Sequence, residues 1–446
     1  MKPSLPKGTR DYLPAEIRKR NYIFDIIRDA FHRFGYEPIE TPAMESLQTL
    51  TGKYGDEGDK LLFKIINNGD FLSDVPEDIY LARESKDLLP LIAKRGLRYD
   101  LTVPFARYLV MNRNQLKLPF KRSAIQPVWR ADRPQRGRYQ EFYQCDADIA
   151  GTASLYSECE LIQLYDSVFA ALKLPVQIRL NHRKLLQGII QHCGMGERFS
   201  EVAGLIDKLD KMGFEKLGAE MEARGFDPEG IKNLFRLIQN PTLSELKQDS
   251  LNELVKTGIE ELTLILDLSS RVGLHNSVVF DPTLARGLSY YTGCILEVVA
   301  IDANMGSIGG GGRYDDLTGS FGMPGIPGVG ISFGAERIYD LMEEKGLFPD
   351  HLQSGGKLIF LSLDAECMSY TFGILMDLRK GGLACEFYPE PAKINKMMSY
   401  ANDRGFDYVA LVGLDEMNAS KVTLKNMKTG EQKSVNSTEI KDNLNF

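Results

Sequence analysis

The sequence predicts an α+β protein in which a helical module interrupts a strand-rich region and a separate α/β domain follows. Three observations support this prediction. Strand and turn patterns dominate residues 122–149 and 277–334, whereas residues 183–275 are almost purely helical in pattern. After a Ser354-Gly355-Gly356 linker, strand and helix patterns alternate to the end of the chain, which indicates a small α/β domain.

The length of 446 residues is enough for two to three domains, each with its own core. We expect a strand-rich core built from residues 1–182 and 276–350, with a helical insertion at residues 183–275. The α/β domain should cover residues 357–446 and end in a hairpin.

The first 42 residues predict an amphipathic helix followed by an extended strand. Within residues 15–34, apolar side chains recur near helical spacing with charged residues between them. Gly35 suits the end of this helix, and the prolines in residues 36–42 disfavour helix at the residues before them. Residues 70–96 are polar and acidic, and we expect them to form a surface loop.

The composition is that of an ordinary globular protein, with 43% hydrophobic and 26% charged residues. A net charge of −7 gives no overall sign of nucleic-acid binding, so any such site must be a local patch. No stretch reaches the roughly 18 apolar residues of a membrane span, and the N-terminus lacks the apolar segment of a secretion signal. We therefore expect a cytoplasmic protein that makes no membrane contact.

Six cysteines lie far apart and form no CxxC pair. This scatter favours reduced, buried thiols over a disulfide framework or a structural zinc site. We expect no bound metal in the protein itself.

A basic run between residues 117 and 138 holds seven basic side chains against one acid, Asp132. A solvated charged face is the ordinary interpretation of such a run. Here, however, the basic turn joins two predicted strands and contains a proline and a glycine. A rigid arginine-rich loop suits phosphate, because guanidinium groups make planar two-point contacts.

Three further segments could bear chemistry. Residues 307–315 contain four consecutive glycines but no phosphate-binding GK[ST] sequence, so alone they indicate only a tight turn or close packing. Residues 286–291 contain an arginine and two adjacent tyrosines, of which a strand would turn only one toward a pocket. Arg337 falls in the first turn of a predicted helix, where the dipole disfavours a cation, so it needs Glu336 or a ligand phosphate nearby.

Taken in order, these segments resemble the three motifs of class II aminoacyl-tRNA synthetases. The opening helix and strand look like motif 1, a dimer-interface element. Residues 129–142 look like motif 2, and residues 330–337 look like motif 3. Any one of these matches is weak, but all three in order are distinctive.

Other segments narrow the resemblance to histidyl-tRNA synthetases. Residues 286–291 and 310–315 are similar to the two histidine-specific motifs of that family. Residues 7–11 fit the same family, and residues 97–102 fit it in a form common in eukaryotic-type members. The resemblance covers nearly the whole chain, and the helical insertion is its least distinctive part.

The resemblance implies a class II catalytic fold: an antiparallel sheet of six or seven strands flanked by helices, with a helical insertion and a separate C-terminal α/β anticodon-binding domain. It implies a homodimer joined through motif 1. It also implies aminoacylation of tRNA(His) with L-histidine, by formation of histidyl-adenylate from ATP and then transfer to the tRNA 3′ end. ATP would enter as a substrate with Mg²⁺, and no prosthetic group is implied.

The resemblance also assigns the ATP site. Arg130 would hold the α-phosphate, and Phe142 and Arg337 would sandwich the adenine, an arrangement that suits a flat purine. Arg286 would lie near the α-phosphate and the histidine carboxylate. Arg130 and Arg286 would therefore be catalytic, because they stabilise charge that develops at phosphorus.

Histidine recognition would fall to six side chains, in which carboxylates and hydroxyls match the two imidazole nitrogens. They are Asp100, Thr102, Gln144, Asp148, Tyr290 and Tyr291. Asp100 would meet the α-ammonium group. Asp148 follows Gln144 by four residues, which places both on one face of a strand.

The motif 2 loop would contact tRNA through Arg133, Gln135, Arg136 and Arg138. Gln135 would read the extra 5′ guanosine of tRNA(His), because an amide offers both a donor and an acceptor. The arginines would hold phosphates, which position the tRNA but do not specify its sequence.

Three alternatives remain open on the sequence. The first is an inactive synthetase-like regulatory subunit of ATP phosphoribosyltransferase, although such chains usually lack the C-terminal domain and the phosphate-binding arginines that are present here. The second is a synthetase for another amino acid, or an amide-forming ligase of the same fold. The third is a pure RNA-binding module, which would not need a nucleotide site.

Overall fold

The computed structural model describes residues 2–51, 60–239, 241–248, 251–286, 290–353 and 356–444. The chain divides into two compact units. The large unit comprises residues 1–11 and 20–347, and the C-terminal unit comprises residues 12–19 and 348–446. Among the described residues, no helix is both long and apolar enough to cross a membrane.

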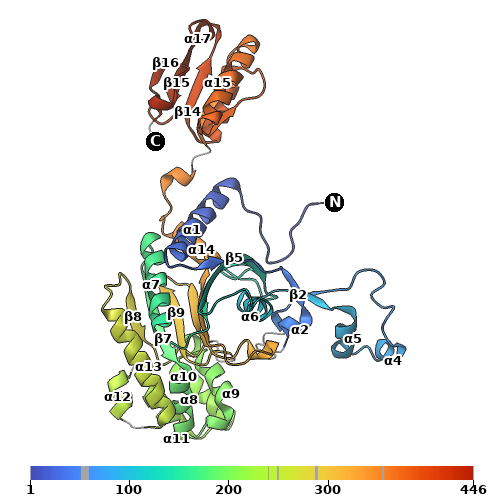
Figure 1. Cartoon of the computed structure of the whole chain (residues 1–446), viewed down its shortest axis with the longest axis vertical. Coiled ribbons are helices and arrows are strands. Elements are labelled where there is room, and N and C mark those ends of the chain that lie inside the picture. The colour runs from blue at the N-terminus through green and yellow to red at the C-terminus, as the bar shows by residue number, and fades with distance from the viewer. Residues whose placement is uncertain are drawn as a thin grey trace. The chain divides into compact units, whose positions relative to one another are not determined.

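An eight-stranded sheet forms the centre of the large unit (Figure 1). Across the sheet the strands are β1 (Glu37–Pro38), β5 (Phe120–Trp129), β6 (Glu141–Ala150), β11 (Gly328–Gly334), β10 (Gly309–Tyr314), β9 (Cys294–Ala300), β7 (Val176–His182) and β8 (Ser277–Phe280). The six inner strands pair antiparallel. The edge strands β1 and β8 pair parallel with β5 and β7.

The predicted α+β fold with a large antiparallel sheet flanked by helices is confirmed, and the sheet, with eight strands, is larger than the predicted six or seven. The six inner strands match that prediction, and two short parallel strands extend the sheet at its edges. β1 is only two residues long, although the Ile39 amide just after it still donates a 3.0 Å hydrogen bond to the Ser123 carbonyl oxygen of β5.

Aromatic side chains pack on one face of the sheet. Phe333 of β11 is fully buried, and its ring centroid lies 4.8 Å from Tyr165 and 5.7 Å from Phe169, both on α7 (Tyr156–Ala171). Phe31 of α1 (Pro14–Arg33) lies 6.1 Å from the same ring. Because side chains alternate along a strand, the neighbours Ser332 and Gly334 face the opposite side of the sheet.

Residues between Arg183 and Ser270 are helical, as predicted. The helices are α8 (Arg183–His192), α9 (Phe199–Ile206), α10 (Leu209–Ala223), α11 (Pro228–Ile238), α12 (Leu243–Gln248) and α13 (Glu253–Ser270). Glycines bring α8 and α13 close together, because a Cβ on Gly258 would lie 2.6 Å from Leu185 Cβ. Figure 1 shows α13 beside α7 and the edge of the main sheet.

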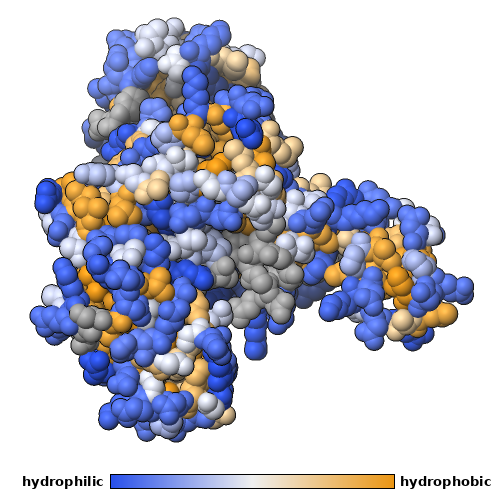
Figure 2. Space-filling model, turned by 60° about the horizontal axis from the view of Figure 1, so that its bottom comes forward, coloured by the Kyte–Doolittle hydropathy of each residue, from blue (hydrophilic) through white to orange (hydrophobic). Residues whose placement is uncertain are grey.

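The predicted surface loop at residues 70–96 is wrong in part, because this segment forms two short helices. They are α4 (Glu77–Ala82) and α5 (Ser85–Ile92), and neither has a buried residue. Acidic side chains in the first turn of each helix stabilise it, because they interact favourably with the helix dipole. The polar composition of the segment had instead indicated a loop. Tyr80 and Leu81 are exposed, and Figure 2 shows apolar side chains gathered on this projecting arm.

The C-terminal unit has the predicted alternation of strands and helices. Its five-stranded sheet has the order β13 (Cys385–Phe387), β12 (Gly356–Ser362), β14 (Phe406–Val412), β15 (Lys421–Asn426) and β16 (Gln432–Asn436). The first three strands are parallel and the last two form the predicted hairpin. The helices are α15 (Met368–Lys380), α16 (Ile394–Asp403) and the unpredicted α17 (Leu414–Asn418).

All six cysteines are free and buried, which confirms the prediction of reduced thiols. Burial raises the pKa of the Cys145 thiol well above its usual value, so this side chain acts as a small apolar group in the core.

A small sheet supports one side of the main sheet. Its strands are β2 (Met44–Ser46), β4 (Arg95–Leu97) and β3 (Lys64–Ile65). Directly after β4, the buried Arg98 donates hydrogen bonds to the carbonyl oxygens of Thr41 (2.5 Å), Pro42 (3.2 Å) and Pro127 (2.9 Å). One guanidinium therefore joins the motif 1 segment to β5.

We predict that Arg98→Met destabilises the large unit, because it leaves buried carbonyl groups without donors. Each such group costs about 1–3 kcal/mol, so a loss of about 3 kcal/mol or more is expected. The midpoint of urea unfolding, followed by circular dichroism, measures the change. The control Arg95→Met alters a half-buried arginine of β4 and should shift the midpoint little. Equal midpoints for the two variants would contradict this role for Arg98.

Candidate active site

A cavity of about 590 Å³ lies on the face of the main sheet opposite the aromatic core. Its volume is in the range of small-molecule binding sites. The ten residues that the sequence assigned to ATP or histidine all line it: Asp100, Thr102, Arg130, Phe142, Gln144, Asp148, Arg286, Tyr290, Tyr291 and Arg337. They come from four separate parts of the sequence, and the sheet brings them together.

The pairing of β6 with β11 forms the floor of this cavity. Gln144, Asp146 and Asp148 alternate along β6 and so share one face. Across from them on β11 stand small residues: Gly334 opposite Gln144, Ser332 opposite Asp146, and Gly330 opposite Asp148. A Cβ on Gly330 would lie 2.0 Å from Asp148 Oδ1, so glycine is required there.

Asp146 is a lining residue that the sequence reasoning missed. A single acid on a strand resembles an ordinary surface residue, and only the period of two from Gln144 to Asp148 could have revealed it. Asp207, at the end of α9 in the helical insertion, was also missed. No local pattern in the sequence marks Asp207, because its place depends on how the insertion packs.

Asp148 is held from two sides. The Tyr314 hydroxyl donates a 2.5 Å hydrogen bond to Asp148 Oδ1, and Arg122 Nη2 lies 2.8 Å from Oδ2. The same Arg122 nitrogen lies 3.7 Å from Asp146 Oδ2. Burial raises the pKa of both aspartates, and Arg122 opposes that rise. One buried cation thus serves two buried carboxyl groups.

Arg122 belongs to β5 and lies beneath the cavity, although the sequence grouped it with the basic loop. Its side chain is fully buried, with the guanidinium carbon 4.7 Å from the centre of the Phe105 ring. Arg122 Nη2 also donates to the Leu101 carbonyl oxygen at 3.1 Å. Arg122 is therefore a fixed part of the cavity floor.

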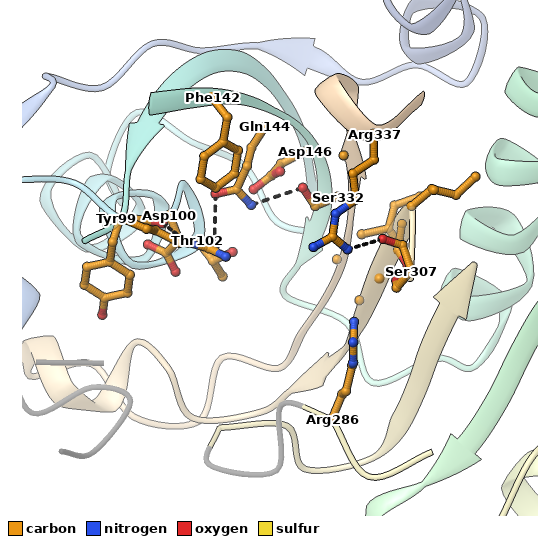
Figure 3. Close-up of a pocket in the computed structure, with 18 of the residues that line it drawn as sticks. Tyr99, Asp100, Thr102, Phe142, Gln144, Asp146, Arg286, Ser307, Ser332 and Arg337 are labelled. Carbon is orange, nitrogen blue, oxygen red and sulfur yellow. Dashed lines mark hydrogen bonds between the residues drawn. The ribbon is translucent and has the colours of Figure 1, made fainter. Parts of the chain in front are cut away.

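Four arginines line the other end of the cavity: Arg130, Arg138, Arg286 and Arg337. Figure 3 shows Arg286 and Arg337 approaching from opposite sides, while Asp100, Thr102, Gln144 and Asp146 lie away from them. Burial lowers the pKa of Arg337, and the neighbouring Arg138, Arg286 and Arg130 lower it further. This end of the cavity is strongly electropositive and suits a polyanion.

Arg130 and Arg286 are positioned by neighbouring polar groups. Arg130 Nε donates to the Tyr99 carbonyl oxygen at 2.8 Å, and its guanidinium carbon lies 5.2 Å from the centre of the Phe142 ring. Arg286 Nη1 lies 3.0 Å from Glu297 Oε1 of β9, and its Nε lies 3.7 Å from Asp207 Oδ1. Residues 287–289, which complete the predicted motif around Arg286, lie outside the described residues.

Arg337 does not pair with Glu336, so that part of the prediction is wrong. Glu336 accepts a 2.9 Å hydrogen bond from Arg20 and a 3.1 Å hydrogen bond from the Tyr143 amide. Arg337 instead donates to the carbonyl oxygens of Gly137 (2.9 Å) and Ser307 (2.5 Å). These carbonyls orient the guanidinium but carry no full negative charge, so the positive charge of Arg337 is not neutralised by them.

The two adjacent tyrosines both line the cavity, contrary to the expectation that a strand would separate them. Tyr290 and Tyr291 precede β9 and are not part of a strand, so alternation does not apply. Their ring centroids lie 4.2 Å apart. Burial raises the pKa of both hydroxyls, and both therefore remain protonated at neutral pH.

The predicted tRNA-contacting residues divide into two groups. Arg138 lines the cavity, whereas Arg133, Gln135 and Arg136 are exposed on the loop and are not among the described lining residues. Gln135 and Arg138 exchange backbone hydrogen bonds of 3.2 and 2.9 Å, which close the turn. Arg136 pairs with Glu344 on the surface. The loop therefore presents its tip to solvent beside the cavity.

Comparison with known proteins agrees with this geometry. A family model described as Histidyl-tRNA synthetase matches residues 8–73 and 93–338. A second model, described as Anticodon binding domain, matches residues 355–445. Together the two models match most of the chain.

Proteins of similar sequence and structure carry related names. A Histidine--tRNA ligase of Phocaeicola vulgatus is 50% identical over 445 residues, covering 98% of each chain. Another, of Porphyromonas gingivalis, is 52% identical over 437 residues, covering 97% of this chain and 96% of that protein. The crystal structure of histidyl-tRNA synthetase from a Nostoc species matches with a TM-score of 0.82 and 28% identity, covering 100% of both chains. The chain therefore belongs to the histidyl-tRNA synthetase family.

Proposed function

We propose that this chain is a histidine–tRNA ligase, which joins L-histidine to ATP and then transfers the histidyl group to the 3′ end of tRNA(His). The observation that carries the proposal is the cavity with two ends of opposite character. Four arginines at one end suit the ATP phosphates, and carboxyl groups at the other suit an amino acid with a basic side chain. Full-length similarity to proteins named Histidine--tRNA ligase supports the same function.

The alternative of an inactive regulatory subunit is not favoured. The chain contains the C-terminal unit that such subunits usually lack, and residues 355–445 of it match the anticodon-binding model. Arg130, Arg286 and Arg337 all line the cavity. Loss of these arginines would be expected in a chain that no longer handles ATP.

In the first step, ATP enters as its Mg²⁺ complex, in which phosphate oxygens and water are the ligands that the ion prefers. Phe142 and Arg337 hold the adenine between them, and Arg130 contacts the α-phosphate. Arg286 lies where the histidine carboxylate attacks the α-phosphorus. Positive charge fixed at this point stabilises the pentavalent transition state more than the bound reactants.

The other end of the cavity holds histidine. Asp100, which follows β4 and lines the cavity, binds the α-ammonium group, with Thr102 beside it. Gln144, Asp148, Tyr290 and Tyr291 surround the imidazole. A site that pairs both ring nitrogens rejects apolar amino acids of similar size, because they would leave its buried polar groups unpaired.

In the second step, the motif 2 loop holds the acceptor end of the tRNA. Arg133, Arg136 and Arg138 contact phosphates, and Gln135 reads the 5′ guanosine. The chain works as a cytoplasmic homodimer joined through motif 1. Residues 1–182 and 276–350 form the catalytic core, residues 183–275 form the insertion, and residues 357–446 bind the anticodon.

The proposal predicts that histidine, alone among the amino acids, drives ATP–pyrophosphate exchange by the full chain without tRNA. Adenylate formation needs only the cavity described above, so exchange should saturate with histidine and ATP. Radiolabelled pyrophosphate incorporated into ATP measures the reaction. Exchange that appeared only with a different amino acid, or with none, would exclude this function.

We predict that Arg286→Ala lowers the turnover of exchange by about 100- to 1,000-fold with little change in the KM for ATP or histidine. Loss of one preorganised charge at the reacting centre has an effect of this size. Steady-state exchange kinetics separate turnover from KM. The control Arg179→Ala removes an arginine of the nearby strand β7. Arg179 pairs with Asp281 and is not among the described residues that line the cavity. Similar turnover in both variants would remove Arg286 from the chemistry.

We predict that Gln135→Ala leaves exchange nearly intact but weakens transfer to tRNA and narrows the preference for tRNA carrying the extra 5′ guanosine. Gln135 is exposed on the loop tip, so its loss should not disturb the cavity. Single-turnover transfer to tRNAs with and without this nucleotide measures the effect. Arg136→Ala is the matched control. Loss of a phosphate contact should weaken transfer to both tRNAs equally and should reduce the salt dependence of tRNA binding. Undiminished discrimination by Gln135→Ala would assign base reading to another residue.

A further inference from the structure

The segment of residues 6–11, ahead of the first helix, packs against the motif 2 loop between β5 and β6. The Gln140 amide donates a 2.8 Å hydrogen bond to the Gly8 carbonyl oxygen. A Cβ on Gly8 would lie 2.7 Å from Gln140 Cγ and 2.9 Å from Pro134 Cγ, and Gly8 has a φ of +82°. Both the close approach and the left-handed backbone therefore require glycine at this position. This segment is thus fitted closely to the loop.

Arg10 joins the motif 2 loop to the helix of motif 3, α14 (Ala335–Glu344). Its Nη1 donates a 2.9 Å hydrogen bond to the Tyr139 hydroxyl, and its guanidinium carbon lies 4.1 Å from the centre of the Tyr139 ring. The same Nη1 lies 3.7 Å from Asp340 Oδ1 on α14. The Tyr139 hydroxyl in turn donates to Asp340 Oδ2 at 3.3 Å. One side chain from outside the three motifs thus fixes Tyr139 against α14.

Tyr139 belongs to a turn that shapes the arginine end of the cavity. Tyr139 lines the cavity beside Arg138. One residue earlier, the Gly137 carbonyl oxygen accepts the 2.9 Å hydrogen bond that orients Arg337. One residue later, a carbonyl oxygen accepts a 2.9 Å hydrogen bond from the Arg130 amide. The turn therefore carries or contacts three of the four arginines at this end, and its position determines where they point.

The contacts of Arg10 are better suited to fixing the loop than to stabilising the fold. The Arg10 side chain is 28% exposed, and a partly exposed ion pair contributes little to the free energy of unfolding. Without Arg10, the Tyr139 side chain would rely on its longer 3.3 Å hydrogen bond to Asp340. A shift of about 1 Å in groups that hold a substrate can cost about 100-fold in rate, so even a small movement of this turn matters.

We propose that Arg10 is a positioning residue for ATP, which holds the motif 2 loop against α14 so that Arg138 and Arg337 face the nucleotide. This inference rests on the proposed function, and it adds to that function a residue that acts through the loop. The carboxyl end of the cavity is built from other elements, namely β6 and the segment before β9. Loss of Arg10 therefore weakens ATP binding selectively.

Steady-state ATP–pyrophosphate exchange by the full chain tests this role. Arg10→Ala should raise the KM for ATP about 10-fold, as expected when a hydrogen bond from a charged donor no longer fixes the loop. The KM for histidine should stay within about twofold. A KM does not depend on the fraction of correctly folded enzyme, so partial misfolding cannot produce this difference. Equal rises in both KM values would overturn the assignment, and so would an unchanged KM for ATP.

Two further variants show whether the effect belongs to this side chain. Arg10→Lys keeps the positive charge but loses the planar group over the Tyr139 ring, so its KM for ATP should fall between those of the parent and Arg10→Ala. Lys7→Ala removes an exposed cation three residues earlier and should leave both KM values unchanged. If Lys7→Ala raised the KM for ATP as much as Arg10→Ala, the effect would come from the charge of the segment, and the assignment would be wrong.

A double-mutant cycle tests whether Arg10 acts through Tyr139. Tyr139→Leu removes the ring and the hydroxyl that Arg10 contacts, and it should itself raise the KM for ATP. If Arg10 acts by holding Tyr139, adding Arg10→Ala to Tyr139→Leu should change the KM for ATP by no more than about twofold. Effects that multiply in the double variant would mean that Arg10 acts independently of the loop, which contradicts the assignment.

The proposed function and the role of Arg10 fail in different ways. If the parent enzyme shows no histidine-dependent exchange, the proposed function fails. If the parent activates histidine normally and Arg10→Ala keeps the parent KM for ATP, only the role of Arg10 fails.

Discussion

Arg122 is buried beneath the cavity with its Nη2 2.8 Å from Asp148 Oδ2 and 3.7 Å from Asp146 Oδ2. Two carboxyl groups at this depth repel each other and lose their hydration, and both effects favour protonation. The guanidinium offsets both effects, and the face of Phe105 and the Leu101 carbonyl hold it in place. Removing one member of such a buried set typically costs about 3–5 kcal/mol, because the remaining charge is left uncompensated. The acidic end of the cavity therefore depends on this one cation.

The same sheet separates charges of opposite sign. Carboxyl groups gather where β6 faces β5 and β11, and the arginines enter from the motif 2 loop, from the segment before β9 and from α14 (Ala335–Glu344). A polyanionic nucleotide and a basic amino acid can then bind side by side, each opposite its own counter-charge. Small residues on β11 leave space for the nucleotide and the amino acid to bind side by side, since a side chain at Gly330 would collide with Asp148.

Much of the site could be predicted from local sequence, because the motifs carry their own residues to the cavity. The residues that were missed or misjudged depend on tertiary structure. Asp146 looks like a surface acid until β11 covers it, and the partners of Arg337 are carbonyls that no side-chain pattern reveals. The tyrosine pair was misjudged because the segment was taken for a strand.

In the fold, too, the features set by local sequence were predicted and those set by tertiary structure were not. Periodicity predicted the helical insertion and the C-terminal alternation, which follow from local amphipathic patterns. Extended segments were predicted where β1 and β8 lie, but two to four residues carry too little pattern to predict that these strands pair parallel at the sheet edges. The arm of α4 and α5 has no buried residue, so it lacks the strong apolar periodicity that reveals a helix. It also lies within residues 74–92, between the two segments that match the family model.

The division of the cavity into two ends is tested most directly by a crystal structure of the full chain with histidine and a non-hydrolysable ATP analogue. We predict the phosphates against Arg130 and Arg286, the adenine between Phe142 and Arg337, and the imidazole against the floor strand β6. An imidazole bound among the arginines, or phosphates bound at the carboxyl groups, would contradict it.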